Sequence, residues 1–255
     1  MTHLPSTFAA ALAEIAQAAG NIVMAHFGKD ARVRRKSDAS PVTAADEAAE
    51  ALILTRLNAL APDVPIIAEE QMAKQPGQAA GPRFFLVDPL DGTEEFIRGG
   101  DEFTVNIALI DQGIAVCGAL LAPARERAFV GEKGRGAWEI SDRPKAFRPI
   151  RARRCPAEGM TVLVSRNHPA SEARLYAGQT IARVQPMSSS LKFAILAAGE
   201  ADLYPRLGPT MEWDTAAGQA ILESAGGQML TASEQIFGYG KPGFRNGGFV
   251  ARGLT

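Results

Sequence analysis

Two aspartates stand three residues apart where an apolar run of the chain ends. The run 84–87 is followed directly by Asp88-Pro89-Leu90-Asp91-Gly92-Thr93. This pattern predicts a buried strand, a proline that stops further strand pairing, and a tight turn that brings Asp88 and Asp91 together. Two carboxylates this close repel each other unless a cation lies between them, and oxygen ligands favour Mg²⁺ over Zn²⁺. The sequence therefore predicts a magnesium site at the end of this strand.

The residues after Asp91 would suit a phosphate beside that metal. Gly92 lets the backbone approach a ligand closely, and the Thr93 hydroxyl can position a water molecule. A helix is expected to begin at Thr93, so that its free N–H groups face the phosphate. The alternative is an ordinary loop, because Asp-Pro and Asp-Gly pairs are common turn formers.

Acidic residues at two other predicted element ends favour the metal site over a simple loop. Glu69-Glu70 follow the short apolar run 64–67, and Asp214 stands near the start of a helix rich in small residues. Any one of these acids could instead cap a helix or lie in a solvated turn. Three acidic strand or helix ends in one chain are typical of a multi-metal phosphoryl-transfer site.

The chain resembles the inositol monophosphatase superfamily of lithium-sensitive, Mg²⁺-dependent phosphatases, and within it most nearly the bacterial CysQ-type 3′(2′),5′-bisphosphate nucleotidases. The resemblance covers nearly the whole chain and is carried by the segments 40–46, 68–70, 88–97, 102–108, 189–193, 203–210 and 213–218. The acidic motifs identify the superfamily. The nucleotidase branch is favoured by Glu95-Phe96, by the run 189–193 and by the run 204–210.

The resemblance implies a role for most of the candidate residues. Two or three Mg²⁺ ions would be held by Glu69, Asp88, the Leu90 carbonyl, Asp91 and Asp214. The attacking water would be positioned and deprotonated by Thr93 with Glu69 or Asp46. The substrate would be contacted by Gly92, Thr93, Ser189, Lys192, Arg206 and Asp214, with Arg206 the first choice for a nucleotide's second phosphate and Lys192 the second.

Structural interpretations of the same residues stay open. Asp46 would favour the dipole at the start of a helix, Ser189 would cap one, and Lys192 would be a surface charge. The chain also departs from the subfamily pattern at two positions, because Ser188 replaces a usual glycine and Glu94 a frequent lysine. Glu94 is expected to face solvent. The alternatives to the nucleotidase are an inositol, sugar or histidinol monophosphatase of the same fold and a non-catalytic nucleotide- or metal-binding protein.

Composition limits the kinds of partner. The 255 residues carry a formal net charge of −1, which gives no long-range attraction to nucleic acid or to an acidic membrane. The three histidines are scattered, which argues against zinc, and the two cysteines indicate a reducing cytoplasm. No signal peptide and no segment long enough to cross a bilayer are expected, although peripheral contact with the inner membrane stays open. The expected partner is a small phosphate ester, and the oligomeric state is not predicted.

The hydrophobic pattern predicts a layered α/β fold, which the resemblance specifies as an αβαβα sandwich. Residues 1–145 are expected to form an α+β part that carries most metal ligands, and residues 146–255 an α/β part that carries Asp214. The first part should contain helices at 6–27 and 43–60, a basic loop or flap at 28–40, an antiparallel meander over 103–140 and a linker at 141–156. The second part should alternate strands at 161–164, 182–185, 202–205 and 227–230 with helices at 170–178, 189–198 and 214–225.

Overall fold

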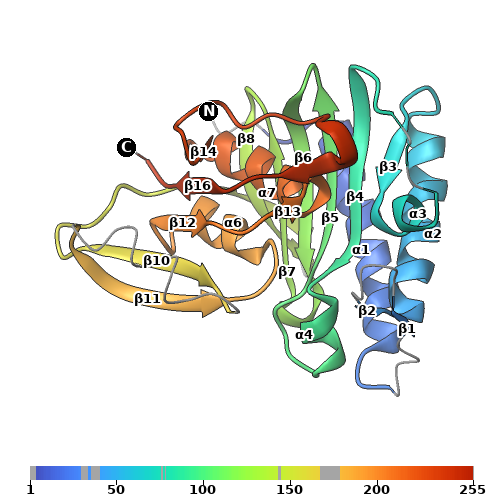
Figure 1. Ribbon diagram of the computed structural model, residues 1–255, viewed down its shortest axis with the longest axis horizontal. Coiled ribbons are helices and arrows are strands. Elements are labelled where there is room, and N and C mark those ends of the chain that lie inside the picture. Colours follow the sequence, from blue (N-terminus) through green and yellow to red (C-terminus); the bar gives the residue numbers. More distant parts are fainter. Residues whose placement is uncertain are drawn as a thin grey trace.

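Two β-sheets alternate with layers of helices (Figure 1). The structure is a computed structural model, and it describes residues 4–29, 34–35, 41–75, 77, 79–142, 145–166 and 179–254. Within this part of the chain, a seven-stranded sheet has the order β3-β4-β5-β6-β7-β8-β9 and a five-stranded sheet has the order β11-β10-β12-β16-β14. The predicted layered α/β class is confirmed.

The first sheet is built from strands that follow one another in the chain. They are β3 (Ile66–Ala68), β4 (Arg83–Asp91), β5 (Thr104–Asp111), β6 (Ile114–Ala122), β7 (Arg127–Glu132), β8 (Gly136–Asp142) and β9 (Lys145–Ile150). β3 is parallel to β4, and all later neighbours are antiparallel, which confirms the meander. The predicted linker at 141–156 is wrong over its first half, because β9 lies there. As the edge strand, β9 tolerates the proline and arginine that argued against a strand.

Alternate residues of β4 face opposite layers of helices. Phe85 and Val87 pack in one buried cluster with α1 (Thr7–His26) and α2 (Ala44–Leu60). Phe84 and Leu86 pack in another cluster with the helices α6 (Leu191–Ala197) and α7 (Glu212–Ser224). The strand is therefore covered on both faces, which explains its continuous apolar run.

The first two helices begin within one residue of the predicted starts, each after a capping hydroxyl. The hydroxyl of Ser6 accepts a hydrogen bond from Ala9 N, and that of Thr43 accepts one from Ala45 N. Helix α1 is long and apolar enough to cross a membrane by length and composition, so the expectation that no segment has this length was wrong. In this structure, α1 buries its apolar face against α2 and the first sheet, as a core helix does.

The second sheet packs against α6 and α7. Its strands are β10 (Met160–Ser165), β11 (Ile181–Met187), β12 (Leu203–Arg206), β14 (Gln228–Thr231) and β16 (Phe249–Arg252). β11, β10 and β12 are parallel, whereas β16 is antiparallel to both β12 and β14. The four predicted strands are confirmed, and β16 is an addition that the sequence interpretation missed.

Short elements complete the described chain. They are β1 (Arg34–Arg35), β2 (Pro41–Val42), α3 (Glu69–Lys74), α4 (Thr93–Ile97), η1 (Pro123–Arg125), β13 (Thr210–Met211), η2 (Pro242–Phe244) and β15 (Arg245–Asn246). The predicted helix at 170–178, on which the fifth layer depends, and most of the predicted flap lie outside the described residues. The division at residue 145 stays a prediction.

Candidate active site

The tight turn predicted between Asp88 and Asp91 lies within β4, and pairing does not stop at Pro89, as predicted, but resumes at Asp91. Asp88 pairs with Asn106 and Asp91 with Thr104, and the register between β4 and β5 is irregular in between. Asp88 Oδ1 accepts a hydrogen bond of 3.0 Å from Leu90 N, which closes the turn. Gly92 follows with φ of 93°, a left-handed conformation that favours glycine. The chain therefore bends sharply and enters α4 at Thr93.

Thr93 connects this turn to the start of α2. Its Oγ1 lies 3.2 Å from Asp46 Oδ1 and 3.1 Å from the Leu90 carbonyl oxygen, so the hydroxyl proton can be donated to either. The other oxygen of Asp46 accepts hydrogen bonds from Thr43 N and Thr43 Oγ1, at 2.8 and 2.6 Å. Asp46 thus caps α2, as its structural interpretation predicted, and reaches Thr93 at the same time. Burial raises the pKa of the Asp46 carboxyl, and the hydrogen bonds from Thr43 oppose that rise.

Glu69 is placed by a contact between two helices. It is the first residue of α3, and Glu70 N donates a hydrogen bond of 2.8 Å to the buried Glu50 Oε2 on α2. Burial raises the pKa of Glu50 to about 7. The carboxylate of α2 therefore fixes the first turn of α3 and, with it, Glu69.

The four acids predicted as metal ligands are electrostatic neighbours. Burial raises the pKa of Asp88 well above its usual range, and the charges of Glu69, Asp91 and Asp214 raise it further. Burial also raises the pKa of Asp214, followed by the charges of Asp91 and Glu69. A divalent cation would relieve this repulsion, and the donors are all oxygens. The residues present therefore fit a hard ion such as Mg²⁺.

Hydrogen bonds from the chain orient these carboxylates. Asp91 Oδ2 accepts from Ser190 N at 2.6 Å and from Ser190 Oγ at 2.5 Å, and Asp214 Oδ2 accepts from Met211 N at 2.7 Å. One oxygen of each aspartate is anchored in this way, and the other can turn to a ligand. Among the described residues, no three acidic, histidine or cysteine side chains already form a finished ligand set for one ion.

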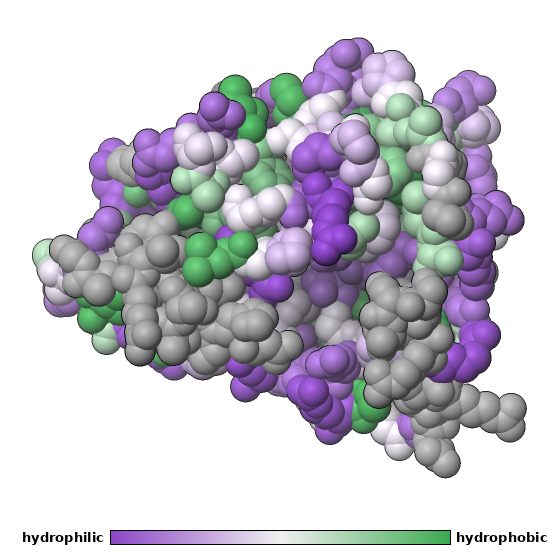
Figure 2. Space-filling view, viewed as in Figure 1, coloured by the Kyte–Doolittle hydropathy of each residue, from purple (hydrophilic) through white to green (hydrophobic). Residues whose placement is uncertain are grey.

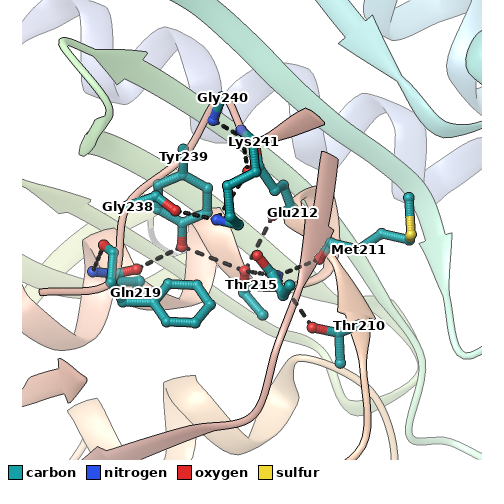
Figure 3. A network of polar contacts seen from close by, with 11 residues as sticks. Thr210, Met211, Glu212, Thr215, Gln219, Gly238, Tyr239, Gly240 and Lys241 are labelled. Atoms are coloured by element: carbon teal, nitrogen blue, oxygen red, sulfur yellow. Dashed lines mark hydrogen bonds and ion pairs between the residues drawn. The ribbon is translucent and has the colours of Figure 1, made fainter. Parts of the chain in front are cut away.

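A polar network fixes the helix that carries Asp214 (Figure 3). Glu212 is fully buried and accepts hydrogen bonds from Gly240 N and Lys241 N, at 2.8 and 2.9 Å. Its ion pair with Lys241 Nζ, also 2.9 Å long, balances the buried charge. Asn246 Nδ2 donates to the Met211 carbonyl at 2.9 Å and lies 3.1 and 3.0 Å from the hydroxyls of Thr210 and Thr215. The start of α7 is therefore held from the C-terminal segment.

An open cleft of about 480 Å³ lies above these groups. In the space-filling view, a hollow near the middle of this face is bordered by hydrophilic residues (Figure 2). Eight predicted site residues line the cleft: Glu69, Asp91, Gly92, Thr93, Ser189, Lys192, Arg206 and Asp214. The remaining three, Asp46, Asp88 and Leu90, are buried at 1 % exposure, so they support the cleft without lining it.

Lys192 is not the surface charge that its structural interpretation predicted. It is buried, its Nζ donates to the carbonyls of Met187 and Ser189 at 3.0 and 2.6 Å, and it lies 4.9 Å from the centre of the Tyr204 ring. The ammonium therefore supports the turn before α6 from within. Ser189 stands in that turn with φ of 53°, and its Oγ accepts a hydrogen bond from Leu191 N, as a capping side chain does.

Several residues organise the cleft to which the sequence interpretation gave no role or, for Ser190, only that of a possible helix cap. Ser190 bonds to Asp91 and receives a hydrogen bond of 3.1 Å from Asn106 Nδ2. Glu102 and Arg166 form an ion pair beside the cleft. Ser190 is next to the candidate Ser189, and Glu102 and Asn106 lie in the segment 102–108 that carries part of the family resemblance. Nothing in the sequence marked Arg166. Glu94 is exposed, as expected, but it lines the cleft together with Arg98, with which it forms an ion pair.

Comparisons with known proteins agree with this geometry. Residues 4–252 match the model of the inositol monophosphatase family. The chain is 41 % identical to the 3′(2′),5′-bisphosphate nucleotidase CysQ of Salmonella typhimurium, over 92 % of this chain and 96 % of that protein. It is 42 % identical to CysQ of Escherichia coli strain K12, over 84 % and 86 % of the two chains.

Solved structures show the same fold. The crystal structure of CysQ from Bacteroides thetaiotaomicron, a bacterial member of the inositol monophosphatase family, superposes with a TM-score of 0.79 at 27 % identity and covers 97 % of each chain. Members of this family generally depend on Mg²⁺, which agrees with the all-oxygen donor set. The resemblance noted in the sequence is confirmed, and the chain belongs to the inositol monophosphatase family.

Proposed function

We propose that this protein is a Mg²⁺-dependent phosphomonoesterase, a 3′(2′),5′-bisphosphate nucleotidase. It would hydrolyse the 3′-phosphate of 3′-phosphoadenosine 5′-phosphate to give AMP and phosphate, a recycling step for nucleotides of sulfur assimilation. The observation that carries the proposal is the cluster of mutually repelling acids beside Thr93, in a chain 41–42 % identical to proteins named CysQ over most of its length.

The acids would hold two or three Mg²⁺ ions through Glu69, Asp88, the Leu90 carbonyl, Asp91 and Asp214. When bound, the ions supply positive charge that lowers the pKa of a water and neutralises phosphate oxygens. The four carboxylates need such a charge to remain ionised together at neutral pH. Asp91 and Asp214, each anchored through one oxygen, can present the other oxygen to the cleft.

Thr93 and Asp46 would orient the attacking water and take up its proton. A hydroxyl carries one proton, so donation from Thr93 to Asp46 leaves the oxygen of Thr93 as an acceptor for a water and leaves the Leu90 carbonyl free to act as a ligand. The raised pKa makes Asp46 a stronger base than an exposed aspartate. Glu69, which lines the cleft, is the second candidate for the proton. No covalent phosphoenzyme is needed.

The second phosphate of the nucleotide would rest on the strand-end cation Arg206. Arg206 lines the cleft, and its charge lowers the pKa of Asp214, so it lies near the acidic cluster. Lys192 would act indirectly, because its ammonium group holds the turn that contains Ser189. Helix α4 begins at Thr93, and its first N–H groups, with Gly92, would face the phosphate that is cleaved.

A panel of phosphate esters tests this assignment against its rivals. The purified protein would be incubated with Mg²⁺ and 3′-phosphoadenosine 5′-phosphate, inositol 1-phosphate, a sugar phosphate or histidinol phosphate, and released phosphate would be measured. We expect the bisphosphate nucleotide to give the highest kcat/KM. Preference for one of the other esters would favour a monophosphatase, and no hydrolysis of any ester would favour a binding protein.

The setting proposed for this reaction is the cytoplasm, with a small phosphate ester as the partner. The charge of −1 gives no attraction to nucleic acid, and α1 is used in the core.

A further inference from the structure

Three parallel strands of the second sheet end at one border of the cleft. Ser165 at the end of β10 pairs with Met187 at the end of β11, and Val162 pairs with Leu203 on β12. Ser165 and Arg206 each lie three residues beyond the Val162–Leu203 pair, so they stand side by side on the parallel strands β10 and β12. The next residues after β10 and β11 are Arg166 and Ser188, and both line the cleft together with Arg206. The carboxyl ends of parallel strands are where α/β proteins bind ligands.

A buried carboxylate joins two of these strand ends. Glu102, only 5 % exposed, comes from the loop between α4 and β5. Its Oε2 accepts hydrogen bonds from Arg166 Nη2 and, at 2.8 Å, from Ser188 N, and its Oε1 accepts one from Arg125 Nη2 at 3.0 Å. Arg125 also donates a hydrogen bond of 3.1 Å to Asp101 Oδ1, so the two guanidinium groups face two carboxylates. Glu102 therefore fixes Arg166 and Ser188 at the border of the cleft.

Arg166 is both fixed and accessible. Its side chain is 45 % exposed although Glu102 holds one of its nitrogens. A guanidinium has five N–H donors, so the bond to Glu102 leaves donors that can grip a phosphate in a bidentate manner. Arg98 also lines the cleft, but it pairs with Glu94 four residues earlier, and Lys192 is buried against backbone carbonyls.

We propose that Arg166, aimed by Glu102, and Arg206 on the neighbouring strand together bind the second phosphate of the nucleotide. Arg166 is then a specificity-determining residue, and Glu102 is its positioning residue. The inference rests on the proposed function, because a substrate with one phosphate has no group for this site.

The same carboxylate links the second-phosphate site to the acidic cluster. Glu102 holds Ser188 N, and two residues later Ser190 donates both its N–H and its hydroxyl to Asp91. The turn between these contacts contains Ser189, whose positive φ of 53° needs support from its surroundings. Loss of the Glu102 charge is therefore expected to loosen Arg166 first and the turn second.

The test compares four variants on two substrates. Arg166→Gln, Arg166→Lys and Glu102→Gln are assayed beside Arg135→Gln, a matched control at an arginine that is similarly exposed, pairs with Glu132 and does not line the cleft. The substrates are 3′-phosphoadenosine 5′-phosphate and 4-nitrophenyl phosphate. Loss of a charge-assisted contact to phosphate should lower kcat/KM of Arg166→Gln for the bisphosphate about tenfold to a hundredfold, mostly through KM. For the bisphosphate, kcat/KM of Glu102→Gln should fall less, and Arg166→Lys should recover part of the loss. Hydrolysis of 4-nitrophenyl phosphate should change about twofold or less in the two Arg166 variants and in the control. Glu102→Gln should lower it as well, because Glu102 also supports the turn that bonds to Asp91.

Binding of AMP without metal gives a second measurement. Calorimetry of AMP against adenosine should show that the 5′-phosphate strengthens binding to the wild type and to Arg135→Gln, and much less to Arg166→Gln. Equal losses of Arg166→Gln on both substrates, or an unchanged affinity for AMP, would overturn the inference and leave the proposed function intact. A wild type that does not hydrolyse the bisphosphate would overturn both.

Discussion

At the scale of single residues, the candidate site is a set of carboxylates that the fold brings together at an energetic cost. Asp88 is buried at 1 % exposure, and three further acids raise its pKa. A group of this kind is unlike the structural ion pairs elsewhere in the molecule, such as Arg153 with Asp202, where the charges balance. Buried carboxylates that repel one another, with no cation to balance their charges, are typical of a functional site.

Removing one of these charges separates chemistry from folding. Asp88→Asn and Asp91→Asn keep the side-chain volume and should each lower kcat about a hundredfold or more, as loss of a main transition-state stabiliser does. The metal-free variants should fold and melt at or above the temperature of the wild type, because like charges have been relieved. The measurements are kcat with Mg²⁺ and thermal unfolding without it. Near-normal turnover in either variant would place the site elsewhere.

Arg206 is expected to act on one class of substrate only. Arg206→Ala should lower kcat/KM for the bisphosphate nucleotide about tenfold to a hundredfold, because a charge-assisted contact to the second phosphate is lost. Hydrolysis of a simple monophosphate should hardly change. Parallel kinetics on the two substrates check this, and an equal loss on both would make Arg206 a structural residue.

Sequence reasoning found the residues with their own chemistry and missed those that act through others. The acids and Thr93 stand at strand and helix ends, where a change from apolar to polar residues marks them. Ser190, Glu102 and Arg166 matter because of contacts across 64 to 99 positions of the chain, and no local pattern carries that information. Lys192 was ambiguous for the same reason, since its burial depends on Tyr204 and the turn before α6.

At the scale of elements, helix contacts place the acids, and α2 with α3 is one example. Burial raises the pKa of Glu50 from its ordinary 4.5 to about 7, so the native state holds this proton more tightly than the unfolded state does. The stability that results is complete below pH 4.5 and is lost as the pH rises through 7. Between these values, the metal-free protein should therefore lose stability with rising pH.

Replacing Glu50 by a neutral side chain should remove this loss of folding stability with rising pH. Glu50→Gln should gain stability relative to the wild type as the pH rises from 4 to 8, by up to about 3 kcal/mol. Denaturant unfolding across this range measures it, with Glu14→Gln on the exposed side of α1 as the control. A stability difference between Glu50→Gln and wild type that does not vary with pH would contradict the assignment.

Helix α7 depends on close packing against the first sheet. A Cβ atom at Gly118 on β6 would lie 2.6 Å from the Ala217 carbonyl oxygen and 2.9 Å from Ala217 Cα. Gly118→Ala should therefore destabilise the protein by about 1–3 kcal/mol, as overpacking does, and should weaken metal-dependent activity by shifting Asp214. Gly81→Ala is the matched control, because nothing lies within 4 Å of its added Cβ. Equal melting temperatures of the two variants would show that α7 is less tightly seated.

The elements themselves were predictable where the periodic pattern was strong. The helices at 7–26 and 44–60 and the meander follow from apolar spacing and caps. β9 was missed because an edge strand can carry arginine and proline, and β16 was missed because its pairing with β12 and β14 is set by the tertiary fold.

At the scale of the whole molecule, the cleft combines two sources of groups. The first sheet with α2, α3 and α4 supplies most acids and Thr93, whereas the second sheet with α6 and α7 supplies Arg166, Lys192, Arg206 and Asp214. A chelator should therefore abolish activity while leaving the fold, and Mg²⁺ should restore it better than Ca²⁺, whose larger and looser coordination suits the site less. Lithium should inhibit at millimolar concentration, an expectation that comes from the family.

The measurement that tests the central claim most directly is the product formed from 3′-phosphoadenosine 5′-phosphate by EDTA-treated protein, with and without added Mg²⁺. Chromatography would separate 5′-AMP from 3′-AMP. We predict no product without metal and stoichiometric 5′-AMP and phosphate once Mg²⁺ is restored. Full hydrolysis after exhaustive removal of metal, or release of the 5′-phosphate to give 3′-AMP, would contradict the proposed function.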